Sequence, residues 1–517
     1  MKKHDILKVT GISFLVLVLL TWIIPAGTYS GAEFVKGEVI PTGLLDVFYN
    51  PLMMIGVVLQ YAVILLVIGG FYGVLSKTGV YTKIVNGVVK KFTNKEKRFL
   101  IISIITFALL ASVVGNPFVL FILVPFAAAV ITLLGFNKVT TMLSTIGALM
   151  IGVIGSTTGS DMAGALVQSY TTEITNNLLV KAIILVVITV LYTMTVLKMS
   201  KVAKVVKKVE VKEETKKTTK KATTKAETKG KKDVVKVKKE TKKETKVETK
   251  KEVKKALLYN SKELNKNKSV LPLLIICSIL MIIIVLSTFN WSLFSIKFFD
   301  ELHASMIELK VFDRAILDSI LGYFVPFGHW DVYHLVALLL VSIPLVGWVY
   351  SIKFDDMIDG FVEGVKVMVK PAFAVLLASL MFSVFITVSD YGLSLAQNNI
   401  YFTIMDFLLG LTKEFNSLVI AVITFIGGFM ISDFSILNSF ISMPLVSMYE
   451  AESFNVVTLV VQCVYGLTLF IAPSSMLLLA GLSLFDINYK EWLKTVGKLI
   501  IKIALLILIV LVITMFI

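Results

Sequence analysis

Residues 155–161 read Gly-Ser-Thr-Thr-Gly-Ser-Asp and interrupt an apolar stretch that extends from residue 139 to residue 170. A second apolar stretch, 454–486, is interrupted in a similar way by Ala472-Pro473-Ser474-Ser475. Breaks of this composition unwind a membrane helix, which is tolerated only where protein or a water-filled cavity surrounds the freed backbone. The two breaks therefore predict an all-α polytopic membrane protein with broken transmembrane helices.

Composition agrees with this interpretation. Apolar residues make up 56% of the 517 residues, too large a share for a soluble protein of this length. Several apolar stretches approach the roughly 20 residues that cross a bilayer. The first is interpreted as a retained helix, with a cleaved signal peptide as the alternative. The expected crossings are 9–25, 52–75, 139–170, 177–198, 270–289, 333–351, 371–390, 454–486 and 495–517.

Two further apolar regions, 99–134 and 417–446, each divide into two short arms around a polar tip. Arms of roughly 11–17 residues are short for spanning helices, so we interpret both regions as re-entrant hairpins. Two ordinary helices joined by a tight turn remain the alternative for 99–134. Either interpretation returns the chain to the side of the membrane from which it came.

The net charge of +16 is confined to one segment. Residues 201–268 hold 26 lysines and 10 acidic residues, so the rest of the chain is neutral. A segment so polar cannot bury a core, which predicts a disordered loop over 199–268. No aromatic residue interleaves with its lysines before Tyr259, which argues against nucleic-acid binding. Attraction to an anionic membrane surface requires fewer assumptions.

The distribution of lysine also predicts orientation. Residues 76–98 carry seven basic residues, whereas the loop 171–176 carries none. Because basic loops stay inside, the amino terminus, 76–98 and the Lys-rich loop are expected in the cytoplasm. Lysine outnumbers arginine 49 to 2, a bias typical of AT-rich bacterial genomes, so we expect a bacterial cytoplasmic (inner) membrane. His329-Trp330-Asp331 and His334 are interpreted as an interface anchor before a crossing.

The chain contains a weak internal repeat. Phe136-Asn137 recurs as Phe454-Asn455 at an offset of 318, and Pro51 recurs as Pro371 at an offset of 320. Five crossings precede the second unit, so the two units would be inverted relative to each other. Inverted repeats with discontinuous helices indicate a secondary transporter with its site where the repeats meet. The predicted organisation is a first repeat (1–198), the Lys-rich loop (199–268), a connecting helix with an external segment (269–332) and a second repeat (333–517).

The candidate site residues lie at the two hairpin tips and the two breaks. Acids at membrane depth, Asp161 and Asp433, are functional candidates by default, with helix capping as the structural alternative. Half-helix amino termini favour an anionic substrate group. Freed carbonyls, together with Asn116, Thr157 and Ser474, are the candidate Na⁺ ligands, and H⁺ coupling is an alternative. The predicted substrate- and ion-binding residues are Gly115, Asn116, Ser156, Thr157, Thr158, Ser160, Asp161, Ser432, Asp433, Ser435, Pro473, Ser474 and Ser475.

Other classes of function find less support in the sequence. No catalytic constellation points to an enzyme, and no glycine loop of the P-loop kind points to ATP-driven transport. No resident cofactor is predicted. A channel or a non-transporting membrane receptor is the alternative from another class. Two matched broken helices argue against a channel, because a conducting pore needs no alternating rearrangement.

Two motifs resemble a known family. The stretch 23–29, Ile-Ile-Pro-Ala-Gly-Thr-Tyr, resembles the amino-terminal signature of YfcC-type carriers, which are relatives of the C4-dicarboxylate anaerobic carriers in the ion-transporter superfamily. Residues 471–475 and 488–494 resemble that family's carboxy-terminal Pro-Thr-Ser break and its Tyr-x-x-Trp-Leu-Lys ending. Ser474 departs from the usual threonine, and Gly115-Asn116-Pro117 replaces an expected acidic tip. The resemblance implies a homodimer formed by scaffold helices, with the hairpins and broken helices as a moving transport domain.

The resemblance allows basic amino acids or C4-dicarboxylates as substrates. No Arg or Lys lies in any of the four breaks and tips, whereas Asp161 and Asp433 favour an ammonium group. The interpretation is therefore an exchanger or ion-coupled carrier of an amino acid, with a C4-dicarboxylate as the alternative. The motion, elevator or rocking, stays open.

Overall fold

The computed structural model describes residues 5–173, 177–200, 268–308, 310–311, 314–315, 320, 322, 325–389, 392–395, 398–412, 414–431 and 433–514. Two sequence predictions fall outside this part of the chain: the predicted disordered loop, except for its first and last residues, and Ser432.

The first half of the chain is almost entirely helical, with one small β-hairpin. A π-turn joins α6 to α7, and five non-helical residues separate α7 from the next turn. The elements are α1 (Asp5–Thr21), β1 (Gly27–Ser30), β2 (Glu33–Lys36), α2 (Asp46–Lys77), α3 (Val80–Phe92), α4 (Glu96–Val113), η1 (Pro117–Leu123), α5 (Val124–Leu133), α6 (Lys138–Met142), η2 (Leu143–Gly147), α7 (Ala148–Ile154), η3 (Ser160–Gly164), α8 (Ala165–Tyr170) and α9 (Leu178–Met199).

The second half adds two further antiparallel strand pairs, β3 with β4 and β5 with β6. Its elements are α11 (Leu271–Thr288), η4 (Trp291–Phe294), α12 (Phe298–Glu308), β3 (Lys310–Val311), β4 (Arg314–Ala315), α14 (Val332–Val349), α15 (Phe354–Leu376), α16 (Ala378–Phe382), η5 (Ser383–Phe385), β5 (Ile386–Ser389), β6 (Gly392–Leu395), α17 (Ile400–Leu409), α18 (Ser417–Met430), α19 (Phe434–Met448), α20 (Ala451–Thr468), α21 (Met476–Leu484) and α22 (Tyr489–Thr514).

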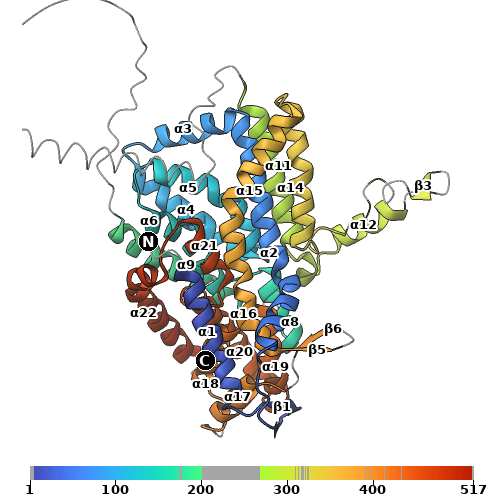
Figure 1. Cartoon of the computed structure of the whole chain (residues 1–517), viewed down its shortest axis with the longest axis vertical. Helices are drawn as coiled ribbons and strands as arrows, with labels where there is room; N and C mark the ends of the chain where they lie inside the picture. The colour runs from blue at the N-terminus through green and yellow to red at the C-terminus, as the bar shows by residue number, and fades with distance from the viewer. Residues whose placement is uncertain are drawn as a thin grey trace, which may run out of the picture.

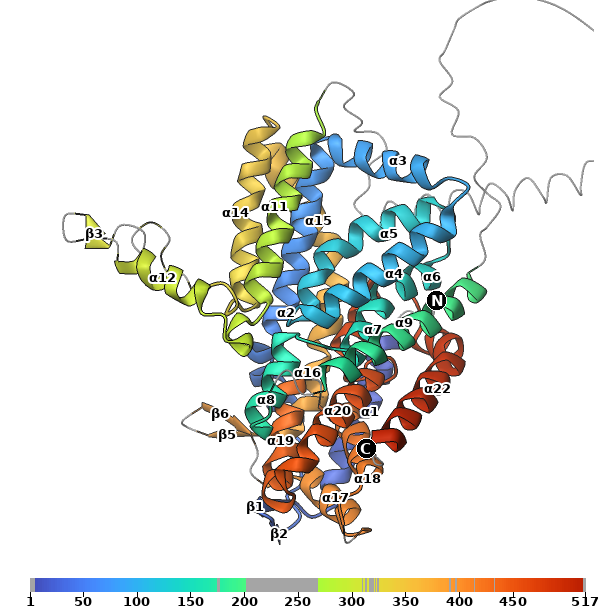
Figure 2. The same ribbon diagram turned by 180° about the vertical axis from the view of Figure 1, so that it is seen from behind.

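Five helices of the described chain are long and apolar enough to cross a membrane: α2, α9, α11, α14 and the continuous helical run Phe354–Phe385. Figures 1 and 2 show α2, α11, α14 and α15 as an upright bundle, with α4, α5, α7 and α9 beside it. Helix α3 lies across one end of the molecule, and α12 projects sideways from it.

The crossing predicted at 371–390 was misplaced. The helix begins at Phe354, and the predicted range contains only the end of α15 followed by α16, η5 and β5. The acidic residues near its start lie on the exposed side of the helix. Gly360, Gly364 and Met368, one helical turn apart, form the buried side. Helices α3 and α17 also occupy segments that the sequence interpretation treated as connections.

The two long helices α2 and α15 cross with their backbones in direct contact. A Cβ atom on Gly73 would lie 1.9 Å from the Gly360 carbonyl oxygen, and one on Gly364 would lie 2.0 Å from that of Gly69. Each helix thus contributes two glycines four residues apart, the spacing that permits close approach of membrane helices. Residue 73 meets 360 while residue 69 meets 364, so the helices are antiparallel at the crossing.

The π-turn η2 is stabilised by two neighbouring helices. The Tyr192 hydroxyl of α9 donates a hydrogen bond to the Leu143 carbonyl at 2.7 Å. Ser103 Oγ of α4 donates to the Ser144 carbonyl at 2.8 Å. Because a π-turn releases backbone carbonyls from the helical ladder, these two hydroxyl groups satisfy acceptors that the helix itself leaves open.

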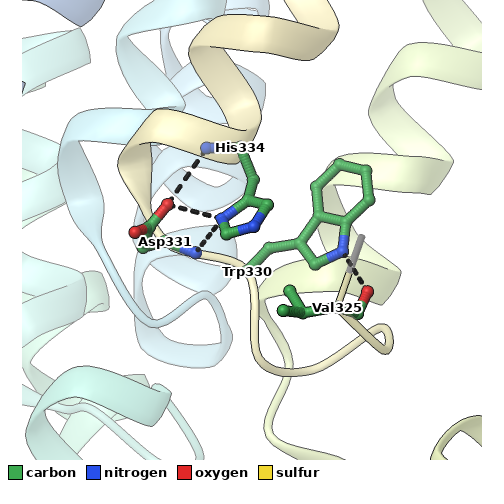
Figure 3. Close-up of polar contacts among 4 residues, drawn as sticks. All are labelled: Val325, Trp330, Asp331 and His334. Carbon is green, nitrogen blue, oxygen red and sulfur yellow. Dashed lines mark hydrogen bonds and ion pairs between the residues drawn. The ribbon is translucent and has the colours of Figure 1, made fainter. Parts of the chain in front are cut away.

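Helix α14 begins with a capping box (Figure 3). The His334 backbone N–H donates to Asp331 Oδ1 at 3.0 Å, and the Asp331 N–H donates to His334 Nδ1 at 3.4 Å. Trp330 Nε1 donates to the Val325 carbonyl at 2.9 Å, and its ring stacks on His334. These four residues fix the start of the helix, and the predicted interface anchor therefore acts as a helix cap.

Alanine at the glycine crossing should destabilise the protein. Gly73→Ala or Gly364→Ala forces the two backbones apart and should cost about 1–3 kcal/mol, as overpacking does. Gly56→Ala, on α2 with nothing within 4 Å of the added methyl group, is the matched control. It should be neutral or up to about 1 kcal/mol stabilising, because alanine favours a helix. Thermal unfolding in detergent measures the stability of each variant. A melting temperature of Gly73→Ala or Gly364→Ala equal to that of Gly56→Ala would contradict the crossing.

Removal of the cap on α14 should also lower stability. Asp331→Ala should cost about 1 kcal/mol, whereas Asp331→Asn should cost much less, because asparagine caps equally well. Burial raises the pKa of the Asp331 carboxyl, but the hydrogen bonds and charge of His334 lower it by a larger amount. The pKa therefore lies below its ordinary value. The charge-dependent stabilisation is therefore complete above about pH 3.9 and is lost as pH falls through the lower folded-state pKa. Melting temperature against pH measures the effect.

Candidate functional site

A cavity of about 120 Å³ lies where the two tips meet the first break. Residues from both halves of the chain, more than 300 positions apart, face it together. Helices α2, α20 and α21 complete its wall. Six of the predicted site residues line this cavity: Gly115, Asn116, Ser156, Asp161, Asp433 and Ser435.

Both tips are built as helix amino-terminal caps. Asn116 Oδ1 accepts a hydrogen bond from the Phe118 N–H at 3.0 Å, and Pro117 occupies the first position of η1. Asp433 Oδ1 accepts from the Ile436 N–H at 3.2 Å at the start of α19. Short polar side chains end one arm and start the next because they satisfy amide groups that a helix leaves open. Asp433 therefore both caps a helix and faces the cavity.

The first break is held by a residue that the sequence interpretation missed, Ser112 near the end of α4. Its carbonyl accepts the N–H groups of Thr157, Thr158 and Gly159 at 3.0, 3.2 and 3.2 Å. Its hydroxyl donates to the Gly155 carbonyl at 2.8 Å and lies 2.9 Å from Thr157 Oγ1. Ser112 is fully buried, so these bonds join the hairpin arm and the unwound segment into one unit. A single serine in an apolar helix carries no signal in the sequence.

The carbonyl groups released at this break accept hydrogen bonds from protein groups. Gln462 Nε2 of α20 donates to the Ile154 and Ser156 carbonyls at 3.2 and 2.7 Å, and Ser112 reaches Gly155. The Thr158 hydroxyl is buried and has no hydrogen-bond partner among the described residues. Protein groups thus form hydrogen bonds with three carbonyls at this break, where the sequence predicted free carbonyls as Na⁺ ligands.

The second break repeats the contact of the first. Ser474 Oγ donates to the Gly428 carbonyl of α18 at 2.8 Å, a pair 46 residues apart, as Ser112 and Thr157 are 45 apart. Ser475 Oγ accepts from the Leu478 N–H at 3.3 Å and caps α21. In both halves, therefore, the unwound segment is hydrogen-bonded to the carboxy-terminal end of the first arm of the preceding hairpin, α4 or α18.

Several predicted site residues do not line the cavity. Thr157 and Ser474, predicted with Asn116 as Na⁺ ligands, bond instead to the ends of α4 and α18. Within the described residues, no group of three His, Cys, Asp or Glu side chains is placed to hold a metal ion. The side chain of Ser160 is not described. The remaining residues away from the cavity are Thr158, Pro473 and Ser475.

Two aromatic pairs flank the cavity. Tyr61 and Phe118 have ring centroids 4.8 Å apart, and Phe434 and Tyr465 have centroids 4.9 Å apart. All four line the cavity, one pair from each half of the chain. The sequence interpretation missed them, because an aromatic residue in an apolar helix is ordinarily a packing residue.

The charge of the cavity is negative. Asp161 and Asp433 line it, and no Lys, Arg or His does so in the described chain. Asp161 is exposed and Asp433 is half-buried. Such a site favours a ligand with a cationic group, or an anionic ligand that arrives with a cation.

A larger polar cavity of about 650 Å³ adjoins the first and shares Asp161 and Ser435 with it. Gln168, Asn290 and Ser439 supply further polar groups to its lining. Nearby, Asn438 Nδ2 donates to the Ala165 carbonyl and to Ser169 Oγ, at 3.2 and 2.9 Å, which ties α19 to α8. Asp161 and Ser435 therefore stand at the junction of the two cavities.

The Ser112 contact gives a direct test of the site. Ser112→Ala removes the hydroxyl that holds Gly155 and Thr157, so solute flux should fall at least about tenfold, since small misplacements at a site are costly. Ser103→Ala is the matched control. It removes an equally buried hydroxyl from α4 that bonds to Ser144, away from the cavity. Flux into proteoliposomes, normalised to protein that elutes as a single peak, measures both. Equal losses would remove Ser112 from the site.

Comparison with known proteins identifies a family. The profile of the C4-dicarboxylate anaerobic carrier family matches residues 5–237 and 229–517. No curated protein sequence matches the chain. Among solved structures, the YdaH transporter of Alcanivorax borkumensis, described as having an unusual topology, aligns with 98% of this chain and 97% of its own at 14% identity. Its TM-score is 0.36, too low to show a shared fold. On the family match, the chain is a multi-pass membrane transporter that belongs to the C4-dicarboxylate anaerobic carrier family.

Proposed function

We propose that this secondary transporter moves a C4-dicarboxylate through the cavity between the tips. One observation carries the proposal: both tips and the first break converge on one cavity that holds two carboxyl groups, in a chain whose two halves match the family profile. Helix α19 begins at this cavity, and its positive dipole end favours a carboxylate. The sequence interpretation preferred an amino acid, and the family favours its alternative.

The two carboxylates of the cavity restrict how a dianion binds. Asp161 and Asp433 repel it unless a cation, Na⁺ or H⁺, enters with it. An amino acid is therefore the second candidate, because its ammonium group would bond to these carboxylates. A C4 acid that carries an amino group meets both requirements, so aspartate belongs among the solutes tested.

We further propose that the two halves are inverted repeats with re-entrant hairpins. The order of elements from α2 to α9 recurs from α15 to α22: a long helix, a short helix, two arms around a tip, a broken helix and a long helix. The antiparallel crossing of α2 and α15 supports the inversion. The matched bonds from Thr157 to Ser112 and from Ser474 to Gly428 support equivalence of the two hairpin-and-break units.

The proposal also includes a setting in the membrane. The chain would lie in a bacterial cytoplasmic membrane with its amino terminus, α3 and the Lys-rich loop inside, as the basic residues of 76–98 favour. Two copies would dimerise through helices outside the hairpin-and-break units, and those units would move by an elevator or rocking motion.

Exchange in proteoliposomes tests the substrate. Vesicles loaded with unlabelled solute should take up labelled succinate, fumarate or aspartate, with Na⁺ and pH gradients imposed separately. Saturable exchange of C4 acids is the expected result. Exchange of arginine or ornithine without any C4 acid would replace the proposal with the amino-acid candidate. Flux that does not saturate would favour a channel.

Replacement of Asp433 tests the site within this function. Asp433→Asn keeps a good helix cap for α19 but removes the negative charge, so flux should fall at least about a hundredfold with little change in melting temperature. Asp331→Asn makes the same change at the cap of α14, outside the cavity, and should leave flux unchanged. Equal flux in the two variants would exclude Asp433 from binding.

A further inference from the structure

One buried charge remains outside the cavity. Lys181 lies in the first turn of α9, and its side chain is 5% exposed. In the described part of the chain, it is the only charged residue that is buried. An ammonium group at this depth is costly, and the amino-terminal end of a helix makes it more so. Packing alone would be served better by leucine or methionine, so the retained amine requires another explanation.

Lys181 lies behind the wall of the first break. A Cβ atom on Gly155 would lie 2.7 Å from the Cα of Leu185, one turn along α9 from Lys181. Cys463 of α20 interacts electrostatically with the lysine, and its thiol lies 3.6 Å from the Ile154 carbonyl. Helix α9 therefore packs against the break one turn from this lysine, and Cys463 of α20 acts on the lysine electrostatically.

Gln462 connects the helix that carries Cys463 to the cavity lining. Gln462, adjacent to Cys463, donates to the carbonyl of Ser156, and Ser156 lines the cavity. The Oε1 atom of Gln462 is buried and accepts no hydrogen bond from a described residue. Gln462 thus keeps an unused acceptor beside a carbonyl of the cavity lining.

The groups that act on Lys181 are few. Cys463 is the titratable neighbour contributed by α20, and α4, α7 and α22, which also pack against α9, place no ion-pair partner on it within the described residues. Its charge is therefore not fixed by a carboxylate at contact distance. The charge that substrate binding changes is that of the cavity, which carries two carboxylates and would gain two more negative charges with a dianion.

We propose that Lys181 is the proton-coupling residue: its amine takes up one proton when a dianion occupies the cavity and releases that proton on the other side of the membrane. The step converts an amine and H⁺ into an ammonium group and requires no other reactant. Binding of the dianion favours the ammonium form, and by linkage the ammonium form favours the dianion. This inference rests on the proposed function, because it requires an anionic substrate in the cavity.

Three variants in proteoliposomes test the inference. Lys181→Gln removes the proton site, Lys181→Arg keeps a charge that cannot be released, and Lys198→Gln changes an exposed lysine at the far end of the same helix. Succinate exchange, which needs no net proton movement, is measured beside uptake driven by an inward proton gradient. Each coupled proton supports up to about tenfold accumulation for one pH unit.

The wild-type protein and Lys198→Gln should accumulate succinate under the gradient. Lys181→Arg should exchange succinate yet show no stimulation by the gradient, and a trapped pH indicator should report no proton entry. Lys181→Gln should lose stimulation likewise. If Lys181→Gln does not give a single folded peak, the arginine variant, which keeps the charge, decides the outcome. Full stimulation in Lys181→Arg would overturn the inference.

The two proposals fail in different ways. A wild-type protein that exchanges no C4 acid contradicts the proposed function. A wild-type protein that exchanges C4 acids but ignores the proton gradient leaves that function intact and removes the role of Lys181.

Discussion

The backbone contact between α2 and α15 is the constraint on which the arrangement of the two halves depends. Glycines at 69, 73, 360 and 364 let the two backbones touch, and any larger residue would separate them. Helix α2 carries Tyr61 into the cavity wall, and α15 packs against α21, whose first residues also line it. The crossing thereby brings together two walls of the cavity, one from each half of the chain.

A second constraint is the need to satisfy backbone groups where helices are interrupted. Unwound segments at membrane depth are stable only if their amides and carbonyls find partners. At the first break, Ser112 of α4 and Gln462 of α20 supply those partners, and both helices also line the cavity. At the second break, Ser474 itself donates to the Gly428 carbonyl of α18. Satisfaction of the backbone and construction of the site are thus one arrangement.

Charge is the feature that most directly ties structure to transport. The cavity holds two carboxylates, its larger neighbour shares Asp161 with it, and the described residues place no cationic side chain in either lining. For the proposed dicarboxylate substrate, this imbalance calls for a co-transported cation or for an amino group on the substrate. The proposed role of Lys181, which is buried behind the cavity wall, concerns the same balance of charge.

The sequence by itself determined that the chain is a helical membrane protein and where its helices are interrupted. Both follow from local chemistry, since apolar runs must cross a bilayer and Asn116, Asp433 or Ser475 must cap the helices that follow them. It also identified six residues that meet in the cavity, because polar groups at membrane depth are rare. The sequence interpretation missed Ser112, Tyr61 and Lys181. Each of them is an isolated residue in an apolar helix, and its contacts are with residues far along the chain. The sequence interpretation also missed the start of α15 at Phe354. The first turns of this helix carry exposed acidic residues, and the opposite face is buried only by contact with α2. Only tertiary contact decided these, since the partner that satisfies a buried polar group is chosen by packing and not by the residues beside it.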